Sequence, residues 1–429
     1  MTLLVRGAVA VVRGDGVETA GDVEVDDGQD VVTVLDATGC VVTPGLVNAH
    51  HHLAQSAFRT LPGTRGVPMA QWLPTMAAAY AEVGLDPELI GAAAAVAVAE
   101  GLLCGVTTVA DHMLNWPFDA SLDLTVEMAA AVVAAAAHLG SRLVFVRGSA
   151  RDDAVWAAES ARAIAEELVP VGGVSADGML QVAVGPAGAH SDARETFDAM
   201  AEVARDRGLR RRTQANEQVD VAIALDRYGR RPIELLGDWG WLAPDVTLAH
   251  LVDLLPDEVA ALATAGVTGT HAPGFDVPMG WGVSRVGDLR AAGIAVGLGT
   301  SGGGLNDAGH LLADGRLALQ VSALTGSPLS ARDVLEMATR GSATGLGRPD
   351  LGHLGEGSAG DLCVWDVSGV ADAGVADPVA GLLWAAPGRR PRDVVVGGRV
   401  VVRDHVLRTA DERAVAARLS ALLAVRRSG

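Results

Sequence analysis

Between residues 46 and 354, short apolar runs alternate with longer helical patterns. The runs are rich in Val, Leu and Ala, and most end in a polar residue. Helix starts are signalled by Asp86 followed by Pro87 and by Ser330 followed by Asp333. Strands before His50 and before Gln214 bring the set to eight, together with the runs at 106–110, 142–146, 180–184, 246–249, 267–270 and 294–298. Repeated strand–helix units of this number predict an α/β fold, a (β/α)8 TIM barrel.

The two ends of the chain resemble each other and differ from the middle. Val-rich runs at 3–5, 9–12, 23–25, 31–34, 361–365 and 394–402 are separated by Gly and Asp turns. This pattern predicts small antiparallel strands. Neither end could bury a core alone, so we expect one small β-sandwich domain built from both. The predicted division is 1–45 and 355–429, with a final helix, for this domain, and 46–354 for the barrel.

Composition limits the partners. The 429 residues include 33 Lys+Arg and 52 Asp+Glu, a net charge of −19, which argues against nucleic acid and anionic membranes. All 33 cations are Arg, which excludes lysine Schiff bases, a P-loop lysine and a carboxylated-lysine metal bridge. The apolar stretches at 90–104 and 128–139 are predicted to be buried helices and not membrane spans.

Three scattered cysteines and the absence of a signal-peptide pattern favour a cytoplasmic protein. With nucleic acid and membranes set aside, a small molecule is the expected partner.

Candidate chemistry lies where the predicted strands end, because barrel active sites are built at the carboxyl ends of strands. Histidine stands at five of these eight ends, although the chain has only 11 histidines. His50 and His52 are two residues apart on a strand, so their side chains point the same way, as a transition-metal site requires. A single histidine at a strand end is more often a hydrogen-bonded structural residue. Independent structural histidines would have no reason to gather at the same end of the barrel, so the set as a whole favours a functional site. The strand-end residues are His50, His51, His52, Asp111, His112, His190, Gln214, Glu217, His250, His271 and Ser301.

Residues 43–52, Thr-Pro-Gly-Leu-Val-Asn-Ala-His-His-His, resemble the first-strand signature of the amidohydrolase superfamily. The resemblance is strongest to the branch of triazine hydrolases and nucleobase deaminases, and within it to 8-oxoguanine deaminases. It covers nearly the whole chain, through further motifs at 105–112, 147–149, 248–250, 270–273, 306–312, 338–343 and 357–362. It implies a barrel enzyme of the hydrolase or deaminase type. Members of the family often form dimers or larger assemblies, so the resemblance also allows a homo-oligomer.

The resemblance also implies a ligand set that this chain only half retains. The family holds one zinc-like ion with both histidines of the first strand, a histidine ending strand five and an aspartate ending strand eight. His50 and His52 match, but the other two positions are Gln214 and Ser301. Gln and neutral Ser are poor zinc donors. We therefore predict no metal and no other cofactor; weak zinc at His50 and His52, completed by substrate atoms or water, is the alternative.

The family's proton-handling residues are kept as Glu217 and His250. The leading hypothesis is thus a metal-independent enzyme that acts on a small nitrogen-containing, heterocyclic compound by His/Glu acid–base catalysis. Hydrolysis, deamination, isomerisation and elimination all remain open. The alternatives are a metal-dependent aminohydrolase of the 8-oxoguanine or guanine deaminase type with an unusual ligand set, and a non-catalytic binding relative. The expected catalytic residues are Glu217, His250, His52 and His50, and the expected substrate-binding residues are Gln55, His271, Gln214 and Ser301.

Overall fold

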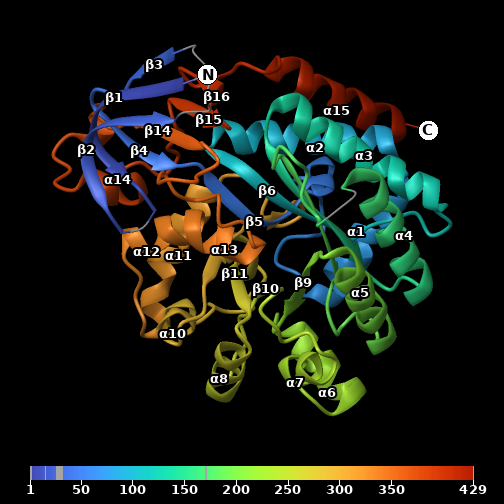
Figure 1. Ribbon diagram of the computed structural model, residues 1–429. Coiled ribbons are helices and arrows are strands. Elements are labelled where there is room, and N and C mark those ends of the chain that lie inside the picture. Colours follow the sequence, from blue (N-terminus) through green and yellow to red (C-terminus); the bar gives the residue numbers. More distant parts are fainter. Residues whose placement is uncertain (1, 15, 26–31, 170–171, 429) are drawn as a thin grey trace.

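The computed structural model describes residues 2–14, 16–25, 32–169 and 172–428 (Figure 1). At its centre lies a parallel sheet in which each strand pairs with the next along the chain, except that the last two do not pair with each other. Its strands carry only buried residues, apart from the start of β9, as expected for a sheet covered on both faces. The strands are β5 (Leu46–His52), β6 (Val106–Met113), β7 (Arg142–Ser149), β8 (Leu180–Pro186), β9 (Arg210–Ala215), β10 (Val246–His250), β11 (Thr268–His271), β12 (Val296–Leu298) and β13 (Ser301–Gly302).

The sheet closes on itself through an interrupted eighth strand. β12 pairs with β11 on one side, and β13, which follows after two residues, pairs with β5 on the other. At the junction, the backbone N–H of Thr300 donates to the carbonyl of His50 at 3.0 Å. A Cβ at Gly299 would lie 2.8 Å from the His50 carbonyl oxygen, so glycine permits this close approach. The predicted (β/α)8 barrel is confirmed.

Helices cover the outside of the barrel (Figure 1). The two predicted starts are confirmed: Asp86 accepts from the N–H of Leu89 at 2.8 Å, and Ser330 with Asp333 forms a capping box. The helices are α1 (Met69–Val83), α2 (Pro87–Leu103), α3 (Leu122–Leu139), α4 (Ala154–Leu168), α5 (Arg194–Arg207), α6 (Val219–Tyr228), α7 (Pro232–Asp238), α8 (Pro256–Ala265), α9 (Pro273–Asp276), α10 (Val286–Ala291), α11 (Leu311–Ser322), α12 (Ala331–Glu336), α13 (Ser342–Leu346), α14 (Pro378–Trp384) and α15 (Glu412–Arg426).

Strands from both chain ends form a second sheet, as predicted. In order across the sheet they are β17, β16, β15, β14, β4, β1 and β2, with β3 beside β1. The expectation of antiparallel pairing throughout is wrong, because β1 pairs in parallel with β3 and β4. Val31, in one predicted run, lies outside the described residues. The bounds are β1 (Thr2–Val12), β2 (Glu18–Val25), β3 (Val32–Asp36), β4 (Cys40–Pro44), β14 (Leu362–Asp366), β15 (Asp393–Val396), β16 (Arg399–Arg403) and β17 (Val406–Leu407).

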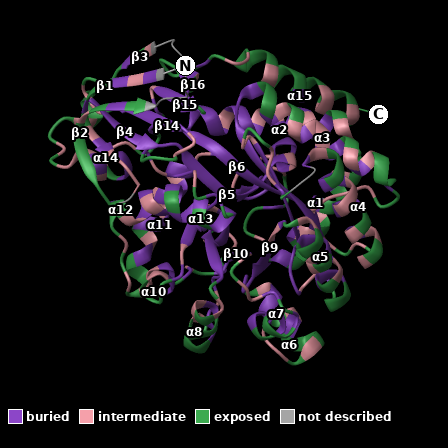
Figure 2. Ribbon diagram, in the orientation of Figure 1, coloured by how far each residue is buried: buried purple, intermediate pink, exposed green. Residues whose placement is uncertain are grey.

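Burial separates the barrel strands from the outer helix faces (Figure 2). Of the described helices, α3 alone is long and apolar enough to cross a membrane by length and composition. One such helix is weak evidence, and its buried positions recur every three or four residues, which is typical of a core helix lying on a sheet. They include Met128, Ala129, Val132, Ala136 and Leu139.

Candidate active site

Four imidazole rings meet inside the mouth of the barrel. The ring centroid of His50 lies 4.8 Å from that of His52, 5.9 Å from that of His112 and 5.2 Å from that of His250. These residues end β5, β6 and β10, so strand closure brings together side chains that are 200 residues apart. His51 alternates to the other side of β5, where its Nδ1 donates to the carbonyl oxygen of Ser301.

His50, His52 and His112 are held neutral. Burial lowers the pKa of His52 to about 4 and that of His112 to about 3, and it lowers the pKa of His50 well below its usual value. His52 donates from Nδ1 to the carbonyl of His112 at 2.7 Å, so its Nε2 keeps a free lone pair. Both ring nitrogens of His50 are buried without a hydrogen-bond partner among the described residues. The cluster therefore presents neutral nitrogen acceptors to the barrel mouth.

Both ring nitrogens of His250 lie close to buried polar side chains. Its Nδ1 lies 2.6 Å from Oδ1 of Asp276, and its Nε2 lies 3.0 Å from Oε1 of Gln214 and 3.6 Å from Oε1 of Glu217. Glu217 and Asp276 are almost completely buried. One imidazole thus lies between two buried carboxylates, which is an arrangement for holding and moving a proton.

The surroundings shift the pKa values of Glu217 and His250 upward for different reasons. Burial raises the pKa of Glu217, because a carboxylate is poorly solvated there, although the neighbouring His250 opposes the shift. Burial alone would lower the pKa of His250, but the carboxylates of Asp276, Glu217 and Asp220 together raise it to about 9. Each group therefore holds a proton more tightly than the same side chain would in water.

Backbone strain concentrates at the same strand ends. Of the nine described non-glycine residues with positive φ, five lie at these strand ends, with φ between +53° and +74°: Asn216, Gln218, His250, Leu251 and Ser301. Such residues cost of the order of 1–3 kcal/mol each and cluster at active sites and ligand-binding segments. Their clustering at the ends of β9, β10 and β12 is independent of the side-chain chemistry and marks the same place.

The structure places the other predicted site residues at this rim, with different partners. Gln55 donates to the hydroxyl of Tyr80 at 3.0 Å, and a Cβ at Gly302 would collide with its Oε1. Ser301 starts β13 next to His51. His271 does not reach the imidazole cluster directly: its Nδ1 lies 3.8 Å from Oδ2 of Asp276.

Sequence reasoning missed Asp276 together with Phe275 and Trp281. The rings of Phe275 and Trp281 pack 5.8 Å and 5.5 Å from the His250 ring and close the site on that side. All three follow β11 in a loop and a four-residue helix, where no apolar periodicity points to a buried role. The Pro273-Gly274 pair before them is a turn signal, but it does not indicate which of the following side chains are buried.

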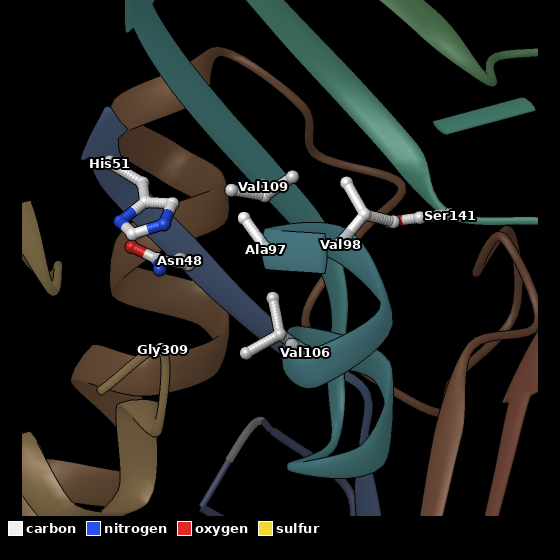
Figure 3. A pocket seen from close by; sticks show the side chains of 9 residues that line it. Asn48, His51, Ala97, Val98, Val106, Val109, Ser141 and Gly309 are labelled. Atoms are coloured by element: carbon white, nitrogen blue, oxygen red, sulfur yellow. The ribbon is translucent and has the colours of Figure 1, made fainter. Parts of the chain in front are cut away.

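A small cavity lies behind the rim on the His51 side (Figure 3). Its volume of about 10 Å³ is enough for one water molecule. His51, Asn48 and Ser141 contribute polar groups to a wall that is otherwise made by α2 and β6. It is too small for a substrate and belongs to the support of β5.

The residues present do not fit the zinc set that the resemblance implies. Among the described residues, no group of three or more His, Cys, Asp or Glu side chains is arranged to hold an ion. His50 offers unpaired nitrogens and Glu217 an unpaired Oε2, but Oε1 of Gln214 lies at hydrogen-bond distance from His250. Two imidazoles remain, whereas catalytic zinc sites normally have three protein ligands.

Comparison with known proteins places the chain in a class. The model of the amidohydrolase family matches residues 41–401, and the chain belongs to this family. An 8-oxoguanine deaminase from Pseudomonas aeruginosa is 33% identical over 96% of both chains. A 5-methylthioadenosine/S-adenosylhomocysteine deaminase from Natronomonas pharaonis is 34% identical over 89% of this chain and 86% of its own.

Among solved structures, the atrazine chlorohydrolase of Arthrobacter aurescens TC1 complexed with zinc superimposes with a TM-score of 0.90. The two sequences are 34% identical, and the superposition covers 98% of this chain and 100% of the chlorohydrolase chain. The predicted family, and an enzyme of the hydrolase and deaminase type, are confirmed. The zinc of this relative contrasts with the donor set at His50, His52, Gln214 and Ser301.

Proposed function

We propose that this chain hydrolyses a C–N bond, or a related ring substituent, of a small nitrogen heterocycle, using Glu217 and His250 for proton transfer and without the family's four-ligand metal. The relatives that support the substrate class act, by their names, on purines, pterins and triazines. The preserved pair carries the reaction in place of a metal-bound hydroxide. His50 and His52 supply neutral acceptors beside it.

One observation carries the proposal: Glu217 Oε1 and His250 Nε2 lie 3.6 Å apart, both buried, directly beside a glutamine that replaces a metal ligand. A relative that had lost its activity would have no reason to keep this geometry after losing two of the metal ligands. The raised pKa of Glu217 suits a group that takes up and returns protons near neutral pH.

The proposed reaction adds water across the C–N bond. The Glu217 carboxylate takes one proton from a water molecule, whose oxygen forms a bond to the ring carbon. His250 donates a hydrogen bond to the ring nitrogen, where negative charge develops. The bond from carbon to the leaving amine breaks, and Glu217 returns its proton to the amine, which leaves as ammonia. The second water proton stays on the product.

The second candidate is a metal-dependent aminohydrolase with an incomplete ligand set. The unpaired ring nitrogens of His50 and the zinc of the triazine-degrading relative favour it. Under this alternative, substrate atoms or water would complete the coordination of an ion bound by His50 and His52. Removal of the ion would then abolish turnover.

The test is turnover of a panel comprising 8-oxoguanine, 5-methylthioadenosine, isoxanthopterin and atrazine, measured before and after dialysis against a chelator. The proposal expects turnover of at least one compound, unchanged by chelation. Glu217→Gln and His250→Asn should each lower kcat by at least about 100-fold with a much smaller change in KM, because general acid–base groups contribute about 10²–10⁴.

Asp314→Asn is the matched control, because Asp314 is also a buried carboxylate but contacts the Gly274 N–H and Asn306 instead of His250. It should keep most of the turnover. Activity that disappears on chelation and returns with zinc would establish the metal-dependent alternative. Binding of a compound without turnover would establish a non-catalytic relative.

A further inference from the structure

We propose that Asp276 is a positioning residue for this reaction: its carboxylate fixes the ring of His250 so that Nε2 faces Glu217. This inference rests on the proposed function for its kinetic consequence. The contact itself is a property of the folded protein and can be tested without a substrate.

The carboxylate of Asp276 is built into the fold. Oδ1 lies 2.6 Å from Nδ1 of His250, and both residues are almost inaccessible to solvent. The backbone of Asp276 is fixed on both sides: its N–H donates to the carbonyl of Ala272 at 3.0 Å, and its carbonyl accepts from the N–H of Trp281 at 3.2 Å. The carboxylate is therefore held in one position beside Nδ1 of the imidazole ring.

This contact decides which nitrogen of His250 can work. A carboxylate oxygen only accepts, so the proton of the contact lies on Nδ1 and Nε2 is the nitrogen that faces Gln214 and Glu217. The ring cannot turn away, because His50, Phe275 and Trp281 pack against it with centroids 5.2, 5.8 and 5.5 Å distant.

The backbone at His250 needs such an anchor. His250 and Leu251 have φ values of +74° and +53°, two consecutive strained residues at the end of β10. The Leu251 N–H donates to the carbonyl of Ala215 at 3.0 Å and thereby ties the strained turn to β9. The bond to Asp276 fixes the side chain of the same turn.

Stability alone does not explain this carboxylate. Its second oxygen, Oδ2, has no hydrogen-bond partner among the described residues and lies 3.8 Å from Nδ1 of His271, which has none either. A buried acceptor left unpaired costs stability. The carboxylate faces two imidazoles at the ends of the adjacent strands β10 and β11. This position suits a group that orients their rings.

The kinetic test uses Asp276→Asn, which keeps the size of the side chain. Its neutral amide removes the carboxylate that keeps both ring nitrogens of His250 protonated, so Nε2–H becomes a weaker hydrogen-bond donor and the ring loses its fixed orientation. Loss of the orienting aspartate in the serine-protease triad lowers kcat by about 10⁴. We expect at least about a 10-fold loss of kcat here, with KM changed much less. In a His250→Asn background the same substitution should cost nothing further, since Asp276 acts through His250.

The spectroscopic test uses substrate-free protein labelled with ¹⁵N-histidine. A short Nδ1–H to carboxylate bond gives a strongly downfield proton resonance, which should vanish in Asp276→Asn and in His250→Asn. It should persist in Glu217→Gln and in the matched control Asp314→Asn.

The two tests separate the two ideas. If His250→Asn retains full turnover, the proposed function fails. The resonance of the wild-type protein, and its loss in Asp276→Asn, would still report the contact between Asp276 and His250. Persistence of the resonance in Asp276→Asn would overturn the positioning role. So would an undiminished kcat of that variant, or an additional loss when it is combined with His250→Asn.

Discussion

Asp192 is a single carboxylate that the fold has buried with neutral donors only. The hydroxyls of Ser149 and Ser191 donate to it at 2.6 and 2.5 Å, and the N–H of Arg151 donates at 3.2 Å. Burial raises the pKa of Asp192 to about 6, despite these hydrogen bonds. The folded protein therefore holds a proton that the unfolded chain has already lost above a pH of about 4.

This difference makes stability depend on pH with a definite sign. Between pH 4 and 6 the unfolded state binds fewer protons, so the free energy of unfolding falls as pH rises. The full fall attributable to Asp192 is about 3 kcal/mol, at about 1.4 kcal/mol for each unit of pKa difference. Asp192→Asn keeps an acceptor for Ser149 but cannot ionise, so it should lose this component.

Urea denaturation of both proteins from pH 4 to 8 measures the effect. The free energy of unfolding of Asp192→Asn, relative to the wild type, should rise through pH 4 to 6 and then level off. A difference that is constant with pH would show that Asp192 ionises normally in the folded state.

At the scale of elements, β9 and the interrupted strand β12–β13 carry the two substituted positions on which the proposed loss of the metal rests. Gln214 lies near the end of β9 and Ser301 begins β13, so both lie at the carboxyl end of the barrel, as do His50 and His52 of β5. We expect wild-type protein to retain far less than one zinc per chain. Gln214→His combined with Ser301→Asp should supply an imidazole and a carboxylate to His50 and His52 and bind zinc tightly.

Elemental analysis after dialysis against a chelator checks both statements. The φ of +55° at Ser301 is tolerated by aspartate better than by most residues, so the double variant is expected to fold. Stoichiometric zinc in the wild type would contradict the metal-free proposal. A folded double variant without zinc would instead show that these two positions do not converge on His50 and His52.

The elements that the sequence predicted are those with a local signal. Alternation along β5 correctly separated His50 and His52 from His51, and capping residues located the starts of α2 and α12. The parallel pairing of β3 with β1 was missed, because a Val-rich run carries no information on its partner. Asp276 was missed because its burial depends on the fold of the β11–α9 connection, which has no repeating pattern.

At the scale of the whole molecule, the barrel and the sheet of the chain ends are joined by a buried ion pair. Nε and Nη2 of Arg142, at the start of β7, lie 2.9 and 3.0 Å from the two carboxylate oxygens of Asp361, just before β14. Oδ1 of Asp361 also accepts from the N–H of Gly397 at 2.7 Å, and Nη2 of Arg142 donates to the carbonyl of Ala359 at 2.9 Å. One bidentate contact thus links three segments far apart in the sequence.

Breaking this pair should loosen the junction. Arg142→Met leaves the Asp361 carboxylate buried and unpaired, which typically costs about 3–5 kcal/mol. We expect a clearly lower Tm, with partial recovery when Asp361→Asn is added, because the unpaired charge is then removed. The control is Arg194→Met, whose partner Asp198 is more than half exposed, so that pair contributes about 1 kcal/mol or less. If Arg142→Met and Arg194→Met had the same small effect on Tm, the junction would be held by the β4–β14 ladder alone and not by this ion pair.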